Sequence, residues 1–185
     1  MQITKSSFFK NWIDLISSQY RDRVENGIEN LPDAFWVDPP SLSGKYHPAF
    51  DHGYGGTVRH VVMALRVALD LVRAEFMGHE YSQREIDVIV VAVLFHDAVK
   101  RNDEGHSAHE HPLDSAIFCN QYVTGGTEIE DDVFCAIRSH MGKWTTSEKS
   151  AVVLHKPEST IEHLVHMADY IASRKYVMYY PDGEL

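Results

Sequence analysis

The chain has 185 residues, which is long enough for one domain and short for two. Hydrophobic residues make up 44% and charged residues 24%, a balance that excludes intrinsic disorder and is typical of a globular protein. The formal net charge of −10 excludes a passive, sequence-independent grip on nucleic acid, because that grip needs a basic surface.

The N-terminal segment, residues 1–30, predicts two helices that pack on the rest of the domain. The first covers residues 7–18 and the second covers 21–29. Asp14 interrupts the apolar face of the first helix and no small-residue cleavage site is present, so a signal peptide is not predicted. We therefore expect a cytoplasmic protein with two buried free thiols, Cys119 and Cys135.

A long segment rich in proline and glycine, residues 31–56, is expected to be irregular. Loops of this length in compact domains are more often functional than idle. The segment is followed by a predicted helix over residues 57–77, where apolar side chains recur at helical spacing.

The next helix is predicted to begin at a capping box formed by Ser82 and Glu85. It contains the longest apolar stretch, residues 88–95, which is far shorter than the ~20 residues needed to cross a bilayer. No membrane association is therefore predicted. The helix delivers an adjacent imidazole and carboxylate, His96–Asp97, at its far end.

Three further helices are expected in the second half of the chain. The first starts at Pro112 and the second covers residues 130–140, while a capping box at Ser159 and Glu162 opens the last. Nothing alternates as a strand would. The sequence therefore predicts a compact, single-domain all-α fold of about six to seven helices, spanning residues 1–185.

The twelve histidines are the most unusual feature of the composition. Ending a buried helix on His96–Asp97 is costly unless the two groups are paired or bound to a metal. His60 lies on the helix over 57–77, and Asp169 lies between apolar neighbours on the last helix. Lys100 follows His96 by one helical turn, so its ammonium can point to the same site.

These residues, in this order, resemble the HD superfamily of metal-dependent phosphohydrolases. The segment LFHDAVKR looks like the family's HD-x-x-K form. HGYGGTVRH, residues 52–60, looks like the GG-x-x-x-H entry of HD domains in certain exoribonucleases and cyclic-nucleotide phosphodiesterases. Three later segments are similar to further conserved motifs of the same family: EHPLDSA, IRSHMGKW and HMADYI. The resemblance covers about residues 47–174 and implies a helical HD-domain fold.

The resemblance also implies the dinuclear-metal subgroup, with six ligands in two sets. The ligands are His60, His96, Asp97 and Asp169 for the first metal, and His111 and His140 for the second, with Asp97 bridging the two. Mixed imidazole and carboxylate ligands suit Mn, Fe, Co, Ni or Zn. His109 is the alternative to His111, because His106, His109 and His111 crowd one short segment.

Two such metals, about 3.5–4 Å apart, can activate a bridging water as hydroxide and polarise a phosphoryl oxygen. Asp97 and Lys100 are then the expected catalytic residues, and no serine or cysteine nucleophile is required. The expected activity is that of a phosphodiesterase or nucleotidase on a small nucleotide-like substrate. A nucleotide is compatible with the acidic chain because bound divalent metals reverse the field locally.

Four side chains beside the expected ligands are candidate substrate contacts: His52, Arg59, Lys143 and Trp144. Lys143 offers a charge for phosphate, and Trp144 offers a ring that either stacks on a base or packs its own loop.

Two alternative functions stay open at this stage. A di-iron HD-type oxygenase acting on a small organic substrate would use the same six ligands, and a catalytically silent nucleotide-sensing module would keep the site without turnover. Long nucleic acid is disfavoured as a partner by the net charge. The aromatic C-terminal stretch, residues 175–185, could pack on a second copy in a homodimer or on the chain's own first helix.

Overall fold

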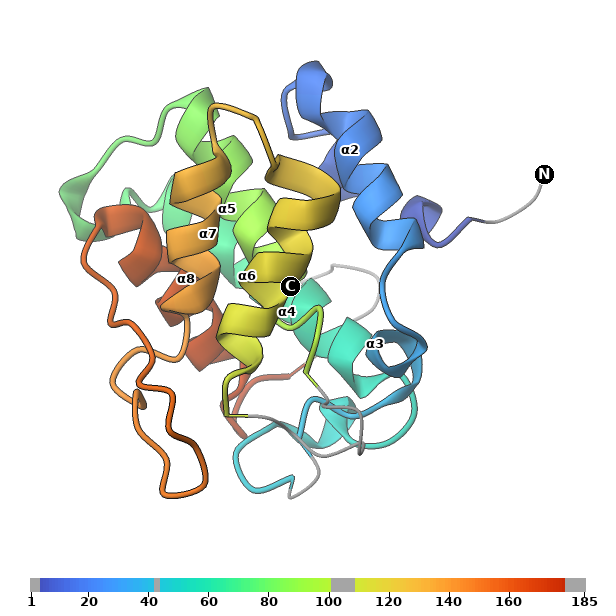
Figure 1. Cartoon of the computed structure of the whole chain (residues 1–185), viewed down its shortest axis with the longest axis vertical. Helices are drawn as coiled ribbons and strands as arrows, with labels where there is room; N and C mark the ends of the chain where they lie inside the picture. The colour runs from blue at the N-terminus through green and yellow to red at the C-terminus, as the bar shows by residue number, and fades with distance from the viewer. Residues whose placement is uncertain (1–3, 42–43, 101–108, 179–185) are drawn as a thin grey trace.

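The structure, a computed structural model, describes residues 4–41, 44–100 and 109–178, and none of these forms a β-strand. The prediction of an all-α fold is therefore confirmed. In chain order the α-helices are α1 (Lys10–Ile13), α2 (Ser18–Glu29), α3 (Asp33–Val37), α4 (Gly56–Arg73), α5 (Gln83–Phe95), α6 (His111–Cys119), α7 (Glu130–Arg138) and α8 (Thr160–Ala172) (Figure 1). Shorter helical turns are η1 (Ser6–Phe9), η2 (Ala49–Asp51), η3 (Phe76–Gly78) and the π-type turn η4 (Asn120–Thr124).

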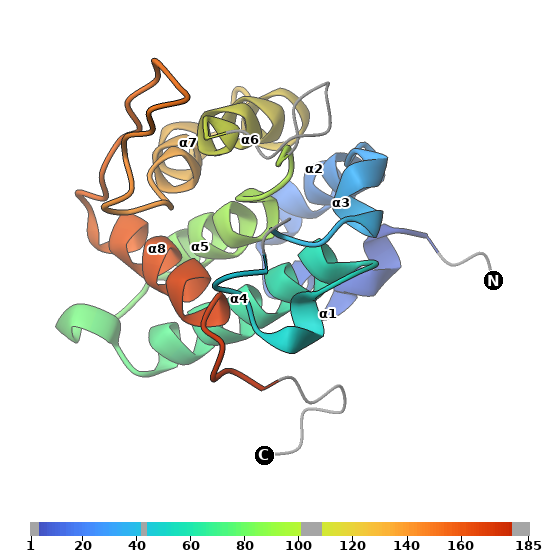
Figure 2. The same cartoon turned by 90° about the horizontal axis from the view of Figure 1, so that it is seen from below.

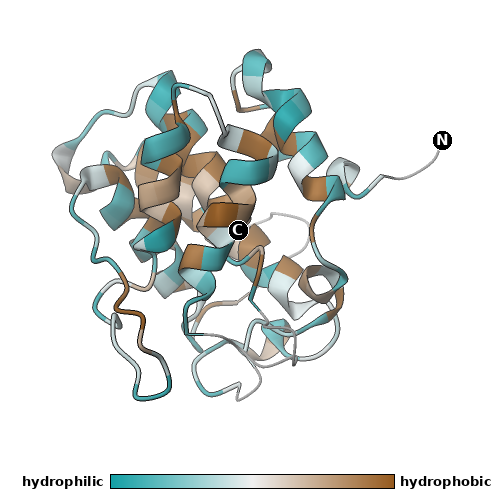
Figure 3. Cartoon of the chain, in the orientation of Figure 1, coloured by the Kyte–Doolittle hydropathy of each residue, from teal (hydrophilic) through white to brown (hydrophobic). Residues whose placement is uncertain are grey.

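The central helix of the bundle is α5. It packs against α4 and α8 on one side and against α6 and α7 on the other (Figure 2). Residues 88–95 are all buried, as expected of a helix that is apolar on every face. Figure 3 shows the result, with hydrophobic residues concentrated in the central helices and hydrophilic residues on the outer ribbons.

Both predicted capping boxes are present. The Ser82 hydroxyl accepts from the Glu85 N–H while Glu85 accepts from the Ser82 N–H, and Ser159 and Glu162 do the same at α8. These bonds satisfy N–H groups that the first turn of a helix leaves without partners. The two helices that carry His96–Asp97 and Asp169 therefore begin where the sequence predicts.

The N-terminal segment packs on the same core, but its first helix is shorter than predicted. The chain forms η1, then α1, and leaves the helix at Asp14. The Ser17 N–H then donates to the buried Asp87 carboxylate, and Arg21 donates to the Ile16 carbonyl. These two bonds, of which the one to Asp87 is long-range, hold the backbone in a turn that periodicity alone could not predict.

Two other predicted boundaries are wrong. The helix predicted over 57–77 ends at Arg73, because Glu75 and Met77 adopt φ values of +50° and +62°, which no α-helix accommodates. The segment 31–56, predicted to be irregular, contains α3 and η2. Short helical turns of this kind are held by tertiary contacts and carry little periodic signal.

Neither cysteine forms a disulfide, and burial raises the pKa of the Cys119 thiol well above its ordinary value. No helix within the described ranges is both long enough and apolar enough to cross a bilayer.

Candidate metal centre

Three helices bring the first group of predicted ligands together. His60 comes from α4, His96 and Asp97 follow the last turn of α5, and Asp169 lies on α8. His60 Nε2 lies 3.0 Å from Asp169 Oδ1 and 3.3 Å from His96 Nε2. His96 Nε2 lies 3.4 Å from Asp97 Oδ2. Ligand atoms about 2.0–2.2 Å from one metal are spaced at roughly these distances.

The other carboxylate oxygen of Asp97 faces a second pair of histidines. Asp97 Oδ1 lies 3.3 Å from His111 Nε2, at the start of α6, and 3.9 Å from His140 Nε2, just after α7. The two Nε2 atoms are 3.2 Å apart. Asp97 thus presents one oxygen to each group, which is the geometry of a carboxylate that can bridge two metal ions.

The backbone fixes the orientation of two of these imidazoles. His96 Nδ1 lies 2.8 Å from the Val93 carbonyl, and His140 Nδ1 lies 2.7 Å from the Ile137 carbonyl. A nitrogen that donates to a carbonyl must carry its proton, so in each ring the Nε2 atom keeps a free lone pair. Both lone pairs point toward the shared carboxylate.

The electrostatics around His140 and Asp97 also favour metal binding. Burial, and then the neighbouring His96 and His111, lower the pKa of His140 to about 3, so its ring is neutral at physiological pH. Burial by itself would raise the pKa of Asp97, but Lys100 and His96 outweigh it and hold that pKa well below its ordinary value. Neutral imidazoles and an ionised carboxylate are the states that metals bind.

The buried polar atoms fit a metal. Asp97 is 1% exposed, and its Oδ1 accepts no hydrogen bond from any described residue. An ionised oxygen in that state is costly without a cation beside it. The groups His60–His96–Asp97 and Asp97–His111–His140 could each hold a metal ion.

Lys100 lies where the sequence predicts a catalytic cation. Its Nζ donates to Asp97 Oδ2 over 2.5 Å, and the side chain lines a cavity of about 450 Å³ beside the centre. His111, His140 and Asp169 form the part of this cavity nearest the ligand atoms. The cavity therefore opens directly onto the candidate metal centre.

The cavity lining also includes aromatic and basic side chains. Trp144 is 44% exposed and stacks on Tyr170, with ring centroids 5.8 Å apart and planes 18° apart. The Arg174 guanidinium lies 4.1 Å from the centroid of the Tyr170 ring and also lines the cavity. Lys143 is exposed and lies over the Trp144 ring, 5.1 Å from its centroid, but does not line the cavity.

His52 and Arg59, both predicted as substrate contacts, do not line the cavity. The Arg59 guanidinium donates to the carbonyls of Phe50, His52 and Tyr54, so it braces the loop before α4. The His52 side chain is exposed and lies against Gly44. Nearness in sequence to His60 does not set the direction in which a loop side chain points, so these two side chains lie away from the cavity lining.

Several other histidines have identifiable places. His109 lines the cavity without joining the ligand cluster, so the geometry favours His111 as the ligand. His166 Nδ1 donates to the His140 carbonyl over 2.7 Å, and its ring occupies space that any side chain at Gly142 would fill. Arg101 and His106 lie outside the described residues, as does the end of the C-terminal stretch, residues 179–185.

His47, which lines the cavity, and Asp51, which is buried beside it, were absent from the predicted ligand and substrate sets. Both precede α4 in a segment without periodicity, so the sequence offered no signal for their direction.

Comparison with protein-family models, with curated proteins and with solved structures found no match for this chain. The resemblance to the HD superfamily therefore stays a prediction, and functional inference rests on the geometry and chemistry of the site.

Proposed function

We propose that this chain is a metal-dependent phosphohydrolase acting on small nucleotide-like substrates, as a phosphodiesterase or nucleotidase. The observation that carries the proposal is the position of Asp97, whose two oxygens face two separate groups of histidines beside a cavity with two basic side chains. This arrangement suits chemistry at a phosphate group, where charge neutralisation and positioning supply most of the catalysis.

Two divalent transition metals would be held by the residues already described. His60, His96, Asp97 and Asp169 would hold the first, and His111 and His140 would hold the second together with Asp97. Such ions supply Lewis acidity, which lowers the pKa of water and neutralises charge on phosphate oxygens. Imidazole and carboxylate donors favour Mn, Fe, Co, Ni or Zn over Ca.

The chain's own residues would bind and orient the phosphate. The Lys100 ammonium has three protons and, among the described residues, uses one on Asp97 Oδ2, which leaves donors for a phosphate oxygen or for solvent. Arg174 also lines the cavity; its Nε and Nη2 donate to the Tyr170 carbonyl and the Ser173 hydroxyl, so its other N–H groups are the ones that would face a phosphate. Both cations line the same cavity as the candidate metal ligands, which brings positive charge to an otherwise acidic protein.

The nucleotide-like character of the substrate is supported by Trp144 and Tyr170. Tyr170 already stacks on Trp144 and lies against the Arg174 guanidinium, so the partly exposed Trp144 ring is the one that can offer a face to a base. Such contacts are worth about 1–3 kcal/mol per base in single-stranded nucleic-acid binding. A cavity of about 450 Å³ is in the range of small-molecule sites. Together with the net charge of −10, this favours a small substrate over a long polymer.

The test uses the full chain, stripped of metal and reloaded separately with Mn²⁺, Co²⁺ or Ni²⁺. We expect turnover of bis-(p-nitrophenyl) phosphate and of at least one nucleotide in a panel of cyclic, mono- and triphosphates. Asp97→Ala is expected to abolish metal binding and turnover, because it removes the oxygens common to both ligand groups. Asp87→Asn is the matched control, since Asp87 is a buried carboxylate on the same helix at its other end.

Three outcomes would overturn the proposal. An Asp97→Ala variant with full activity would remove the site assignment. Oxygen-dependent consumption of an organic substrate by iron-loaded protein, without phosphate-ester turnover, would favour the di-iron oxygenase. Metal binding with neither activity would favour a regulatory module.

A further inference from the structure

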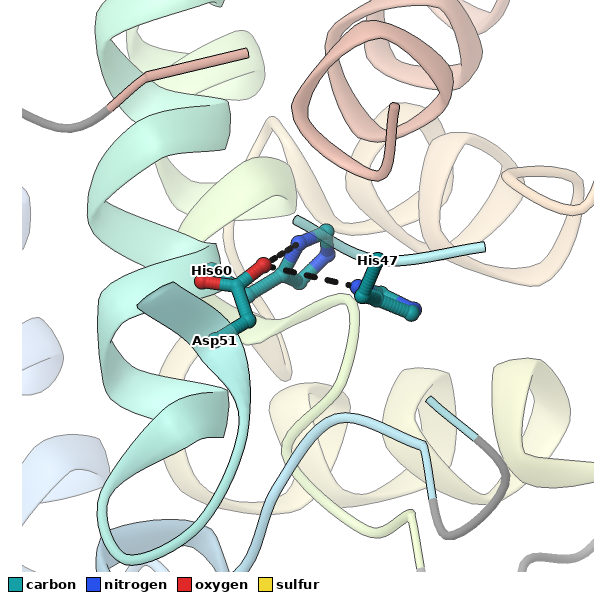
Figure 4. Close-up of side chains that lie close together, drawn as sticks. All are labelled: His47, Asp51 and His60. Carbon is teal, nitrogen blue, oxygen red and sulfur yellow. Dashed lines mark ion pairs between the residues drawn. The ribbon is translucent and has the colours of Figure 1, made fainter. Parts of the chain in front are cut away.

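One buried carboxylate near the centre is absent from both groups of ligands described above. Asp51, in η2, is 0% exposed, and neither of its oxygens accepts a hydrogen bond from a described residue. A carboxylate in that position is costly unless a cation or an N–H group faces it. Figure 4 shows two candidates, with His47 and His60 both directed at the same Asp51 oxygen.

The surrounding backbone holds Asp51 firmly in place. The Asp51 N–H donates to the Pro48 carbonyl, and Arg59 donates to the carbonyls of Phe50 and His52 on either side. Gly56 passes so close to the Asp51 carbonyl that a side chain there would collide with it. The carboxylate is therefore positioned by its loop before any ligand arrives.

His60 faces Asp51 and the candidate metal centre at once. Its Nε2 lies among the ligand atoms, while its Nδ1 lies 3.7 Å from Asp51 Oδ2. A carboxylate opposite Nδ1 favours the tautomer with the proton on Nδ1, which leaves the Nε2 lone pair for metal and increases its basicity. For His96 and His140, the backbone carbonyls of Val93 and Ile137 hold the proton on Nδ1 in the same way.

His47 shares the same carboxylate oxygen. Its Nδ1 is buried 3.5 Å from Asp51 Oδ2, and its ring packs edge-on against His60 with centroids 4.9 Å apart. The side chain also lines the cavity, and Figure 4 shows its second ring nitrogen on the side away from Asp51. With the proton on Nδ1 facing the carboxylate, Nε2 carries a lone pair and can accept a hydrogen bond from a hydroxyl in the cavity, such as the P–OH group of a monoprotonated phosphate.

We propose that Asp51 is a positioning residue for two histidines, orienting His60 to bind metal and His47 to contact phosphate in the cavity. The proposal rests on the metal centre of the proposed function and deepens it by coupling metal affinity to substrate binding. One carboxylate, placed by the loop before α4, sets both rings.

His47, Asp51 and His60 could also be read as a further metal site, because their donor atoms lie close together. That reading requires His60 to lose both ring protons, since its Nε2 already faces Asp169 and His96. A neutral imidazole carries one proton, so orientation by Asp51 is the arrangement that needs no further deprotonation.

The first test measures Mn²⁺ binding to the metal-free chain by calorimetry. Asp51→Asn is expected to weaken binding to the His60 group about 10- to 100-fold, the usual effect of removing a carboxylate behind a metal-binding histidine. Binding to His111 and His140 should change far less. Asp87→Asn is the matched control, because it removes a buried carboxylate at the far end of α5 and should lower stability without changing metal affinity.

The second test separates His47 from His60. His47→Ala should leave Mn²⁺ affinity within about twofold but weaken binding of inorganic phosphate to the Mn²⁺-loaded protein roughly tenfold, as expected for losing the one hydrogen bond that the phosphate P–OH donates to Nε2. Asp51→Asn should weaken the binding of both Mn²⁺ and inorganic phosphate. A His47→Ala variant with unchanged phosphate affinity would contradict the role of His47.

The third test needs no variant. In Zn²⁺-loaded protein with ¹⁵N-labelled histidine, NMR should show the proton of His60 and that of His47 on Nδ1. A His60 ring with no Nδ1 proton would overturn the proposal. Unchanged Mn²⁺ affinity in Asp51→Asn would also overturn it. So would a third metal ion that binds the wild type but not Asp51→Asn. If the wild type binds Mn²⁺ but hydrolyses no phosphate ester, the proposed function fails while the role of Asp51 toward the metal is still decided by calorimetry.

Discussion

At the residue scale, the choice between His109 and His111 has a geometric answer that can be tested. His111 Nε2 lies 3.2 Å from His140 Nε2 and 3.3 Å from an Asp97 oxygen, whereas His109 only lines the cavity. We expect His111→Ala to lose one of two bound metals, and His109→Ala to keep both. Metal analysis of dialysed protein measures the difference. Loss of a metal from His109→Ala alone would reverse the assignment.

Lys100 pairs with Asp97 and, in the proposed function, also contacts a phosphate oxygen, so its substitution tests both roles. Replacing Lys100 by Ala should lower kcat/KM for phosphate esters about 100-fold, a typical cost of losing one charge-stabilising donor. The same change frees Asp97 Oδ2, so Mn²⁺ affinity should be unchanged or higher. Steady-state kinetics and calorimetry on one preparation test both. Weaker Mn²⁺ binding would show that Lys100 supports the ligand set and not the substrate.

At the element scale, the predictable features are those encoded locally. Ser82 caps α5 through two reciprocal bonds with Glu85, and α5 carries His96–Asp97 at its other end. The capping boxes and the apolar run of α5 were predicted from adjacent residues alone. The ends of α1 and α4 were not predicted. The first depends on the distant Asp87 carboxylate, and the second depends on the left-handed backbone of Glu75 and Met77.

The cap of α5 gives a stability prediction. Ser82→Ala should lower the free energy of unfolding by about 1 kcal/mol, the usual cost of losing a capping side chain. Ser159→Ala should cost a similar amount at α8. Urea denaturation measures both. Ser18→Ala is the control, because Ser18 is exposed and its hydroxyl makes no hydrogen bond with the described residues; an equal loss there would show that capping is not the cause.

At the scale of the whole molecule, metal binding and stability should be linked through His60. Burial alone would lower the pKa of His60, but Asp169 and Asp51 outweigh it and raise that pKa from 6.5 to about 9 in the metal-free protein. A raised pKa stabilises the fold below pH 6.5, and this contribution is lost as pH rises through 9. A metal ion bound to His60 Nε2 replaces the proton there and removes this dependence of stability on pH.

We therefore expect the Tm of metal-free protein in a chelator to fall between pH 6.5 and 9, and the Tm of Zn²⁺-loaded protein to change less. Thermal unfolding across this range measures the effect. The Tm of metal-free His60→Gln should not fall over this pH range. Identical slopes in the metal-free and Zn²⁺-loaded wild type would contradict the assignment of His60 as the linked group.

The sequence by itself determined the helical fold, the two capped helices and the residue types of the metal centre. The fold and the caps follow from local rules, since helical periodicity and capping act over a few neighbouring positions. The six candidate ligands came from the cost of burying His96 beside Asp97 and from the resemblance to the HD superfamily. Only the tertiary structure decided which Asp97 oxygen faces which histidines, that His111 and not His109 joins the cluster, and that Asp51 lies behind His60. The physical reason is that α4, α5, α7 and α8 meet through packing between distant segments, and side-chain direction in the loop before α4 is set by those contacts.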